Sequence, residues 1–302
     1  QKGQAQVAVD VISRALASNN RVPDCHYNMA FALQTLGRLS EAVGYYRQAI
    51  ELKPDYVEAH TNLGNVLKEL GSHREAAASY ERVIALKPSA EAHYNLANAQ
   101  AKLGQLSEAV ASYQRALALK PDLVGAHNNL ANALVAHGRS DEALIHFQRA
   151  LEVDPNLVEA HVNLGTILLQ QGKLDAAAAQ FERALGIDAN SADAQANLGN
   201  VRLAQGRLVA AEQCYRRALE LKPDAAEVDN NLGLVLTARG DFEEAGRRFQ
   251  RALIRQPDSI DAHNNLARLF LSMGQGGNAL DVVGRALDIG ETAQSKALFV
   301  QC

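Results

Sequence analysis

A short motif that returns at a nearly constant interval limits this chain to a repeat architecture. The motif is an Asn followed by Leu or Met and then by Gly or Ala, and it occurs eight times at a spacing of 34 residues, with a single interval of 33. The short interval falls where Lys87–His93 has one residue fewer than Lys53–His60. We interpret this difference as a deletion in a turn, where deletions are tolerated. The motif asparagines are Asn28, Asn62, Asn95, Asn129, Asn163, Asn197, Asn231 and Asn265.

Other positions of the repeat predict two helices joined by two kinds of turn. A Gly follows each motif Asn by nine residues, which suits the left-handed cap at the end of a helix. An Ala and then an aromatic residue four positions later, such as Ala42 and Tyr46, form one stripe of a second helix in seven repeats. Six of the seven prolines then end that helix. Because aromatic residues make up only 5% of the chain and Trp is absent, the core must consist mainly of Ala, Leu and Val.

This order of helix, Gly turn, helix and Pro turn at a period of 34 residues resembles the tetratricopeptide (TPR) repeat over essentially the whole chain. The resemblance implies an all-α fold, a right-handed TPR superhelix (α-solenoid) whose first helices line a concave groove. We predict a partial repeat with only a second helix over residues 1–22, eight full repeats over 23–290, and the start of a further repeat or a capping helix over 291–302. The chain begins at Gln1 rather than Met and ends in an apolar segment, which we interpret as a sign of a longer parent polypeptide.

Charge and cysteine content exclude several classes of partner. The 30 basic and 34 acidic residues give a net charge of −4, so no bulk positive field attracts nucleic acid or an anionic membrane. No stretch approaches the roughly 20 apolar residues of a membrane span, and no secretory signal is present. Three scattered cysteines are too few for a disulfide framework. We therefore predict a cytoplasmic protein without a nucleic-acid or membrane partner.

The motif asparagines are the best candidates for a binding site. Asn costs a helix about 0.6 kcal/mol relative to Ala, so eight equivalent residues point to a use for the amide. Amides both donate and accept hydrogen bonds, so regularly spaced ones can hold the backbone of an extended chain. The pattern resembles the asparagine ladder of protein O-linked N-acetylglucosamine transferases, and more broadly bacterial TPR-containing transferases, which implies peptide binding by the eight asparagines. Four repeats add a second asparagine three residues later on nearly the same helix face, namely Asn65, Asn98, Asn132 and Asn200.

Two interpretations of the ladder stay open: the amides contact a bound peptide, or they bond to the neighbouring helix and set the stacking. The second row departs from Asn at Phe31, Thr166, Leu234 and Arg268, so we expect polar contact to be strongest in the middle repeats. The residue before each ladder Asn is never basic, so the chain lacks the carboxylate clamp with which other TPR modules grip an acidic C-terminus. Acidic residues near the starts of the first helices are explained by the helix dipole, and an acidic tail would be repelled.

Neither a metal site nor a catalytic site is predicted. Six histidines occupy one repeat position, but neighbouring helices pack about 8–10 Å apart, too far for ligands that each lie about 2.1 Å from a shared zinc. We interpret these histidines as packing residues. No phosphate-binding loop or nucleophile motif occurs, and we predict no cofactor and no enzymatic activity for this chain. The six histidines are His26, His60, His93, His127, His161 and His263.

The sequence therefore favours a non-catalytic protein-interaction scaffold that binds an extended or disordered polypeptide along its groove. The alternative is a substrate-recruiting or assembly arm of a larger bacterial enzyme, either a glycosyltransferase or an S-adenosylmethionine-dependent methyltransferase, whose catalytic domain is absent from this chain. A homodimer through the convex face or the apolar ends is a further hypothesis.

Overall fold

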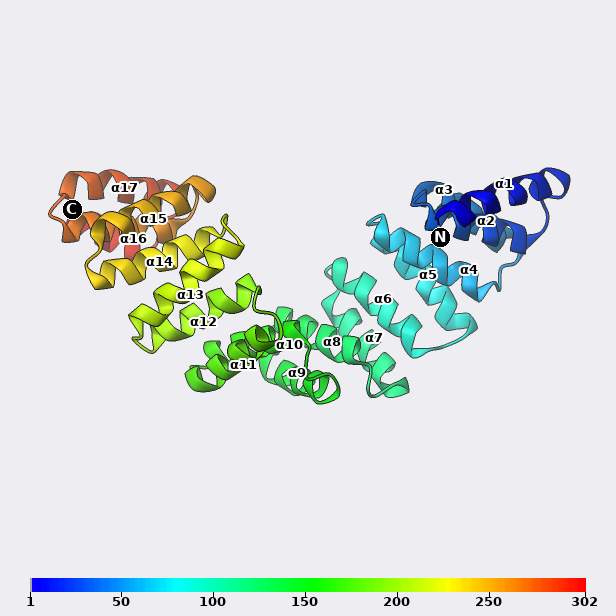
Figure 1. Ribbon diagram of the computed structural model, residues 1–302, viewed down its shortest axis with the longest axis horizontal. Helices are drawn as coiled ribbons and strands as arrows, with labels where there is room; N and C mark the ends of the chain where they lie inside the picture. The colour runs from blue at the N-terminus through cyan, green and yellow to red at the C-terminus, as the bar shows by residue number, and fades with distance from the viewer. Residues whose placement is uncertain (1) are drawn as a thin grey trace. The chain divides into compact units, whose positions relative to one another are not determined.

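The computed structural model describes residues 2–302, and within them every regular element is one of 18 α-helices (Figure 1). The chain divides into two compact units, unit 1 ending at Pro155 and unit 2 comprising Asn156–Cys302. Unit 1 contains the single helix α1 (Lys2–Ser18) and four helix pairs. These pairs are α2 (Pro23–Thr35) with α3 (Leu39–Leu52), α4 (Val57–Glu69) with α5 (His73–Leu86), α6 (Ala90–Lys102) with α7 (Leu106–Leu119), and α8 (Val124–Ala136) with α9 (Ser140–Val153).

Unit 2 contains four further pairs followed by the single helix α18 (Ala293–Gln301). The expectation of an all-α solenoid of helix-turn-helix repeats is confirmed. The pairs are α10 (Val158–Gln170) with α11 (Leu174–Ile187), α12 (Ala192–Ala204) with α13 (Leu208–Leu221), α14 (Ala226–Arg239) with α15 (Phe242–Arg255), and α16 (Ile260–Ser272) with α17 (Gly276–Ile289).

The turn inside each pair is built on the predicted glycine. All eight of these glycines have φ between 71° and 85°, the left-handed region that residues with a side chain avoid. At Gly37, the next amide, Arg38 N, donates to the carbonyl of Leu33 at 2.9 Å, which closes the first helix in a Schellman-type cap. The glycines are Gly37, Gly71, Gly104, Gly138, Gly172, Gly206, Gly240 and Gly274.

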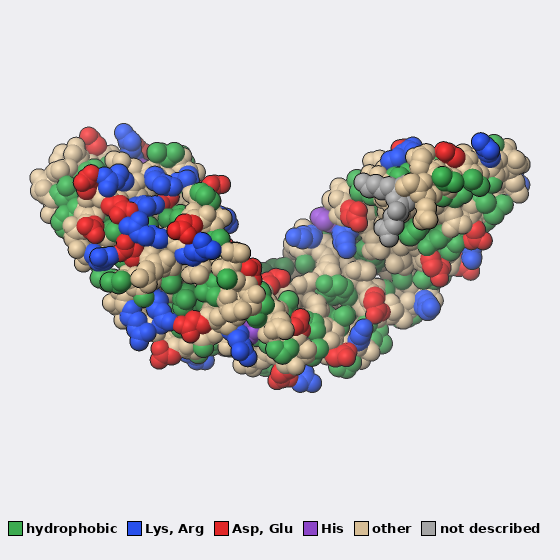
Figure 2. Space-filling view, viewed as in Figure 1, with side chains coloured by type: hydrophobic (Ala, Val, Ile, Leu, Met, Phe, Trp, Pro, Cys, Tyr) green, Lys and Arg blue, Asp and Glu red, His purple; other side chains and the backbone are tan. Residues whose placement is uncertain are grey.

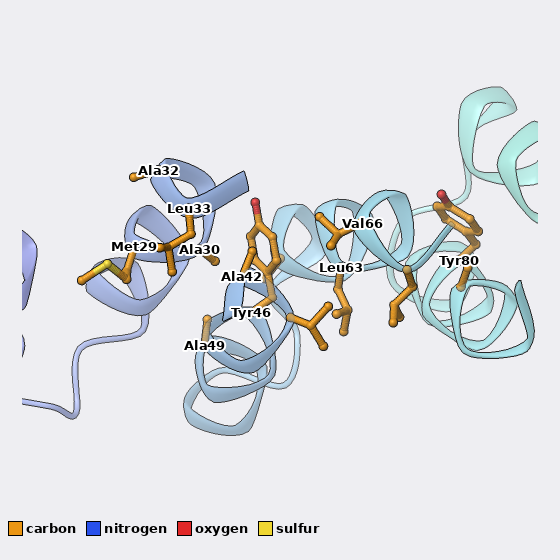
Figure 3. Close-up of a cluster of buried hydrophobic side chains, with 14 of the residues drawn as sticks. Met29, Ala30, Ala32, Leu33, Ala42, Tyr46, Ala49, Leu63, Val66 and Tyr80 are labelled. Carbon is orange, nitrogen blue, oxygen red and sulfur yellow. The ribbon is translucent and has the colours of Figure 1, made fainter. Parts of the chain in front are cut away.

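In seven of the eight pairs, the core contains an aromatic ring of the second helix beside a small residue of the first, and Val283 takes the place of the ring in the pair of α16 and α17. Tyr46 and Tyr80 are fully buried in unit 1 among Ala, Leu and Val side chains (Figure 3). The packing leaves no room beside the ring, because a Cβ added at Gly64 would lie 2.7 Å from Cε1 of Tyr80. Equivalent contacts of 2.6–2.8 Å would arise at Gly165, Gly199 and Gly233. The small residue therefore sets how closely the two helices approach.

Within each unit, the first helices form a surface of their own. Backbone contacts join α2 with α4 and α6 with α8 in unit 1, and join α10, α12, α14, α16 and α18 in succession in unit 2. No pair of successive second helices in residues 2–302 is in comparably close contact. The first helices thus lie on the inner, more tightly curved side of each unit, which we call the first-helix surface.

The single helices at the two ends leave apolar side chains in solvent. On α1, Val7 and Val11 are each about three-fifths exposed, and on α18 Val300 is 85% exposed. Among residues 2–302, no helix combines the length and the apolar character that crossing a membrane requires.

We predict that Gly199→Val destabilises unit 2 by about 1–3 kcal/mol, because the new side chain must displace the ring of Tyr215, whose Cε1 lies 2.6 Å from the added Cβ. Urea unfolding followed by circular dichroism measures the change. Gly44→Val is the matched control, since Gly44 is an exposed helical glycine with no atom within 4 Å of an added Cβ. Equal midpoints for the two variants would contradict the packing account.

Candidate functional site

The ladder asparagines all lie on first helices, and most of them are accessible. Asn28 is exposed, and the next six ladder residues along the chain are partly exposed. Asn265 differs, because only 8% of its surface is exposed. Its neighbour Asn264 accepts a hydrogen bond from Ser295 of α18 at 3.1 Å, so α18 packs over this end of the ladder. Asn265 is therefore the ladder residue with the least access to a ligand.

Several ladder amides tie one first helix to the one before it. The Nδ2 group of Asn129 donates to Asn98 Oδ1 at 2.9 Å, and that of Asn231 donates to Asn200 Oδ1 at 3.0 Å. Asn62 donates in the same direction to the hydroxyl of Tyr27 at 3.0 Å. Asn265 likewise donates to Asn230 Oδ1 at 3.0 Å. These bonds join helices of successive repeats and contribute to stacking.

Other ladder amides keep their donors available. Within residues 2–302, the side chains of Asn28 and Asn95 have no hydrogen-bond partner. Asn197 only accepts, at 3.4 Å, from Asn200 Nδ2. A primary amide carries two donor hydrogens and two acceptor lone pairs, so each of these side chains can still bond to a passing backbone. The ladder thus contains both stacking residues and uncommitted amides.

The second row has a role that the sequence analysis missed. Asn65, Asn98 and Asn200 each accept a hydrogen bond from a buried tyrosine hydroxyl of the second helix, at 2.8, 2.6 and 2.8 Å. The donors are Tyr80, Tyr113 and Tyr215. Burial raises the pKa of all three hydroxyls, so they remain protonated donors. The sequence carries a partial signal, because the second row is Thr166 or Leu234 in two of the three repeats that have Phe in place of Tyr, whereas the third has Asn132.

Among the buried tyrosines of the second helices, Tyr46 has no second-row asparagine in its repeat and uses another acceptor. Phe31 occupies the second row of that repeat, and the hydroxyl of Tyr46 instead donates to Gln34 Oε1 at 2.8 Å. Phe31 itself is 54% exposed on the first-helix surface. The requirement is therefore a polar acceptor for the buried hydroxyl, which Asn or Gln can meet.

Unit 2 contains a cavity of about 400 Å³ among the ladder residues. Asn197, Asn200 and Asn231 contribute three amides to its wall, and Ala196 and Val228 contribute apolar surface. Its remaining wall includes Asp193, Asp224 and Glu227 with a single basic residue, Lys222. The cavity lies between α12 and α14, at the junction of two repeats, and combines amides with a net negative surround.

The six aligned histidines are packing residues, as predicted. All are buried, with 6–8% of their surface exposed. Nε2 of His60 lies 3.0 Å from the carbonyl oxygen of Pro54, and that of His127 lies 2.9 Å from the carbonyl oxygen of Pro121, so the ring bonds to the preceding turn. No group of three or more potential metal ligands occurs within residues 2–302.

The residue that lies 19 positions after an aligned histidine is on the second helix of the same repeat and can contact the histidine ring. Nδ1 of His127 lies 3.1 Å from Nδ1 of His146, and Nδ1 of His161 lies 2.8 Å from Oε1 of Gln180. Burial and the charge of His127 both lower the pKa of His146, against an opposing effect of Glu142. Cys214 occupies the same position two repeats later, and burial raises the pKa of its thiol.

Comparisons with known families and structures identify the repeat. Residues 82–298 match the family model described as the cilia and flagella-associated protein 70 C-terminal domain. Residues 35–71 and 57–89 match two models of the TPR repeat, and no catalytic family is among these matches. No curated protein matches the chain.

Solved structures share the fold. The crystal structure of MamA is 25% identical, with a TM-score of 0.52, and the match covers 54% of this chain and 96% of that one. YrrB, titled a TPR protein with an unusual peptide-binding site, is 24% identical with a TM-score of 0.54 over 62% of this chain and 96% of its own. The APC/C hetero-tetramer Cut9-Hcn1 is 17% identical with a TM-score of 0.67. That match covers 98% of this chain but only 58% of the longer one.

We predict that unit 1 loses stability as the pH falls below about 6.5, the ordinary pKa of His. The folded state lowers the pKa of His146, so the unfolded chain binds more protons in this range and acid favours unfolding. His93, whose pKa burial also lowers, adds to the effect. The measurement is the melting temperature between pH 7.5 and 5.

His146→Gln is the informative variant, because it reproduces the pairing of His161 with Gln180 without a titratable group. Its melting temperature should fall less with acid than that of the wild type. An unchanged pH dependence in His146→Gln would rule out His146 as a contributor.

Proposed function

This chain belongs to the family of TPR domains described as the cilia and flagella-associated protein 70 C-terminal domain, and we propose that it is a non-catalytic scaffold that binds an extended polypeptide along its first-helix surface. The TPR fold is consistent with a role as a protein-interaction scaffold. We propose in addition which surface holds the partner and which side chains bind it. The partner segment is extended or disordered, and the ladder amides bond to its backbone.

The cavity of unit 2 is the observation that carries this proposal. It brings Asn197, Asn200 and Asn231 to one wall, and it is large enough, at about 400 Å³, for a short stretch of extended chain. The Nδ2 group of Asn197 has no partner within residues 2–302, so a bound peptide carbonyl would give it its first acceptor. In unit 1, Asn28 and Asn95 offer unpartnered amides on the corresponding positions. The ladder amides recur once in each repeat and do not form pockets for particular side chains. We therefore expect them to recognise the backbone of the bound peptide and not its sequence.

Charge restricts the partner further. Asp193, Asp224 and Glu227 outnumber Lys222 around the cavity. A free C-terminal carboxylate or an acidic segment would therefore meet like charge, whereas a neutral or basic segment would not. Ordering a flexible partner costs conformational entropy, so we expect affinity to be modest and distributed over several repeats.

Two similar structures support this proposal, since YrrB is described as having a peptide-binding site and Cut9-Hcn1 as a hetero-tetramer. The resemblance to the asparagine ladder of protein O-linked N-acetylglucosamine transferases remains a hypothesis. A recruiting arm of a larger enzyme would use the same surface in the same way, and a homodimer would leave this surface free if it formed through the second helices or the ends.

We predict that Asn197→Ala weakens peptide binding by about threefold to tenfold, the effect of losing one hydrogen bond, while stability is unchanged or slightly improved. The probe is a fluorescent peptide selected from a random display library on the wild-type chain, and its affinity is measured by anisotropy. Selection that yields no binder, or a binder with equal affinity for the variant, would refute the proposed site.

Asn200→Ala is the matched comparison, because its amide supports the structure. Without it, the buried hydroxyl of Tyr215 loses its acceptor and Asn231 loses its tie to the preceding repeat. We expect a loss of about 1–3 kcal/mol in the free energy of unfolding. Equal stability of Asn197→Ala and Asn200→Ala would contradict the division between uncommitted and structural amides.

A further inference from the structure

One position in the histidine column holds a buried carboxylate instead. Asp229 of α14 is fully buried, and three arginines of α15 surround it. Arg248 Nη1 and Arg255 Nη1 each lie 3.1 Å from a carboxylate oxygen, and Arg251 Nε lies 3.5 Å away. A buried charge must be paired to be tolerated, and here one negative charge orients three positive ones.

The ion pairs continue from this site to α13. Arg248 also contacts Glu244 at 3.1 Å, and Arg216 contacts the same carboxylate at 2.8 Å. These hydrogen bonds lower the pKa of Glu244, so the network remains charged at neutral pH. Glu212 joins the network by pairing with Arg216, at 2.9 Å, and with Arg239. The connected network therefore contains five arginines and three carboxylates, an excess of two positive charges.

Two of these arginines are partly exposed and keep donors without a hydrogen bond to the protein. The ion-pair contact of Arg251 with Asp229 is through Nε at 3.5 Å, and within residues 2–302 its guanidinium group makes no hydrogen bond. Arg216 uses Nε and Nη2, which leaves Nη1. Their side chains are 45% and 40% exposed. Glu212 and Glu244 hydrogen-bond the guanidinium group of Arg216, and Asp229 attracts that of Arg251, so binding through the remaining donors costs less ordering than at an arginine without such neighbours.

Both arginines line a hollow on the second-helix side of unit 2. This hollow, of about 250 Å³, is lined by Arg216, Leu219 and Glu220 of α13 and by Arg248 and Arg251 of α15. Glu220 is paired separately with Arg217, whose Nη1 donates to it at 2.9 Å. Figure 2 shows Lys and Arg side chains gathered over the part of unit 2 that Figure 1 labels α15, with Asp and Glu between them.

We propose that this hollow, which we call the arginine site, binds a doubly charged tetrahedral oxyanion of the phosphate monoester class. The two excess positive charges match the charge of such a dianion, and guanidinium forks bond to phosphate oxygens in bidentate fashion. Arg251 and Arg216 supply the direct contacts, and Asp229 and Glu244 position them. The arginine site lies on second helices, so it is independent of the peptide proposal for the first-helix surface.

Inorganic phosphate and O-phosphoserine are the two probes. Binding is measured by calorimetric titration at about pH 7.5, where both are largely dianions, and at constant ionic strength set with sodium chloride. Binding of both probes would mean that the dianion alone is recognised, and binding of phosphoserine alone would mean that a phosphorylated side chain is the ligand. Both results support the proposal, and absence of binding by both probes overturns it.

Arg251→Gln tests the assignment of residues. This change removes the exposed fork and leaves Arg248 and Arg255 on Asp229, so the fold should persist. We expect at least a tenfold loss of affinity with an unchanged melting temperature. Arg268→Gln is the control, because Arg268 is an exposed arginine on a first helix of the same unit. Equal affinity of Arg251→Gln and Arg268→Gln would overturn the proposal.

Discussion

Each unit depends on the ring that a second helix buries against a Gly or Ala of its own first helix. This contact brings the two helices so close that an added Cβ at Gly64 or Gly199 would overlap the ring. The same contact determines which side of the first helix carries the ladder asparagines. The motif Asn precedes the small residue by two positions, or about 200° around a helix, so a small residue facing the second helix places the amide on the other side. The first-helix surface and its asparagines follow from that packing.

The same contact gives the second row its role. Where the buried ring is a tyrosine, its hydroxyl must find an acceptor, and Asn65, Asn98 or Asn200 supplies one from the first helix. The acceptor is then fixed in place, and Asn98 and Asn200 also receive the ladder amide of the following repeat. A chain of hydrogen bonds thus runs from the core of one repeat to the surface of the next. The uncommitted amides of Asn95 and Asn197 lie on a surface that this chain holds rigid.

The sequence was sufficient to predict the helices and the glycine turns, because these depend on local spacing, and the resemblance to TPR repeats implied that the first helices line the groove. It was not sufficient to separate structural from uncommitted amides, since that depends on a hydroxyl from another helix, such as Tyr113 reaching Asn98. The burial of Asn265 arises from α18, whose packing has no counterpart in the other repeats. The sequence analysis did not single out Asp229, because only the structure shows that it is buried and that three arginines of α15 surround it.

The central claim is that the ladder contains two kinds of amide, and nuclear magnetic resonance of the chain labelled with ¹⁵N at asparagine side chains tests it directly. During titration with an extended peptide, the side-chain signals of Asn95 and Asn197 should shift, because their donors are available. The signals of Asn129 and Asn231 should shift much less, because they already bond to Asn98 and Asn200. Peptide binding that leaves the Asn95 and Asn197 signals unmoved would contradict the account.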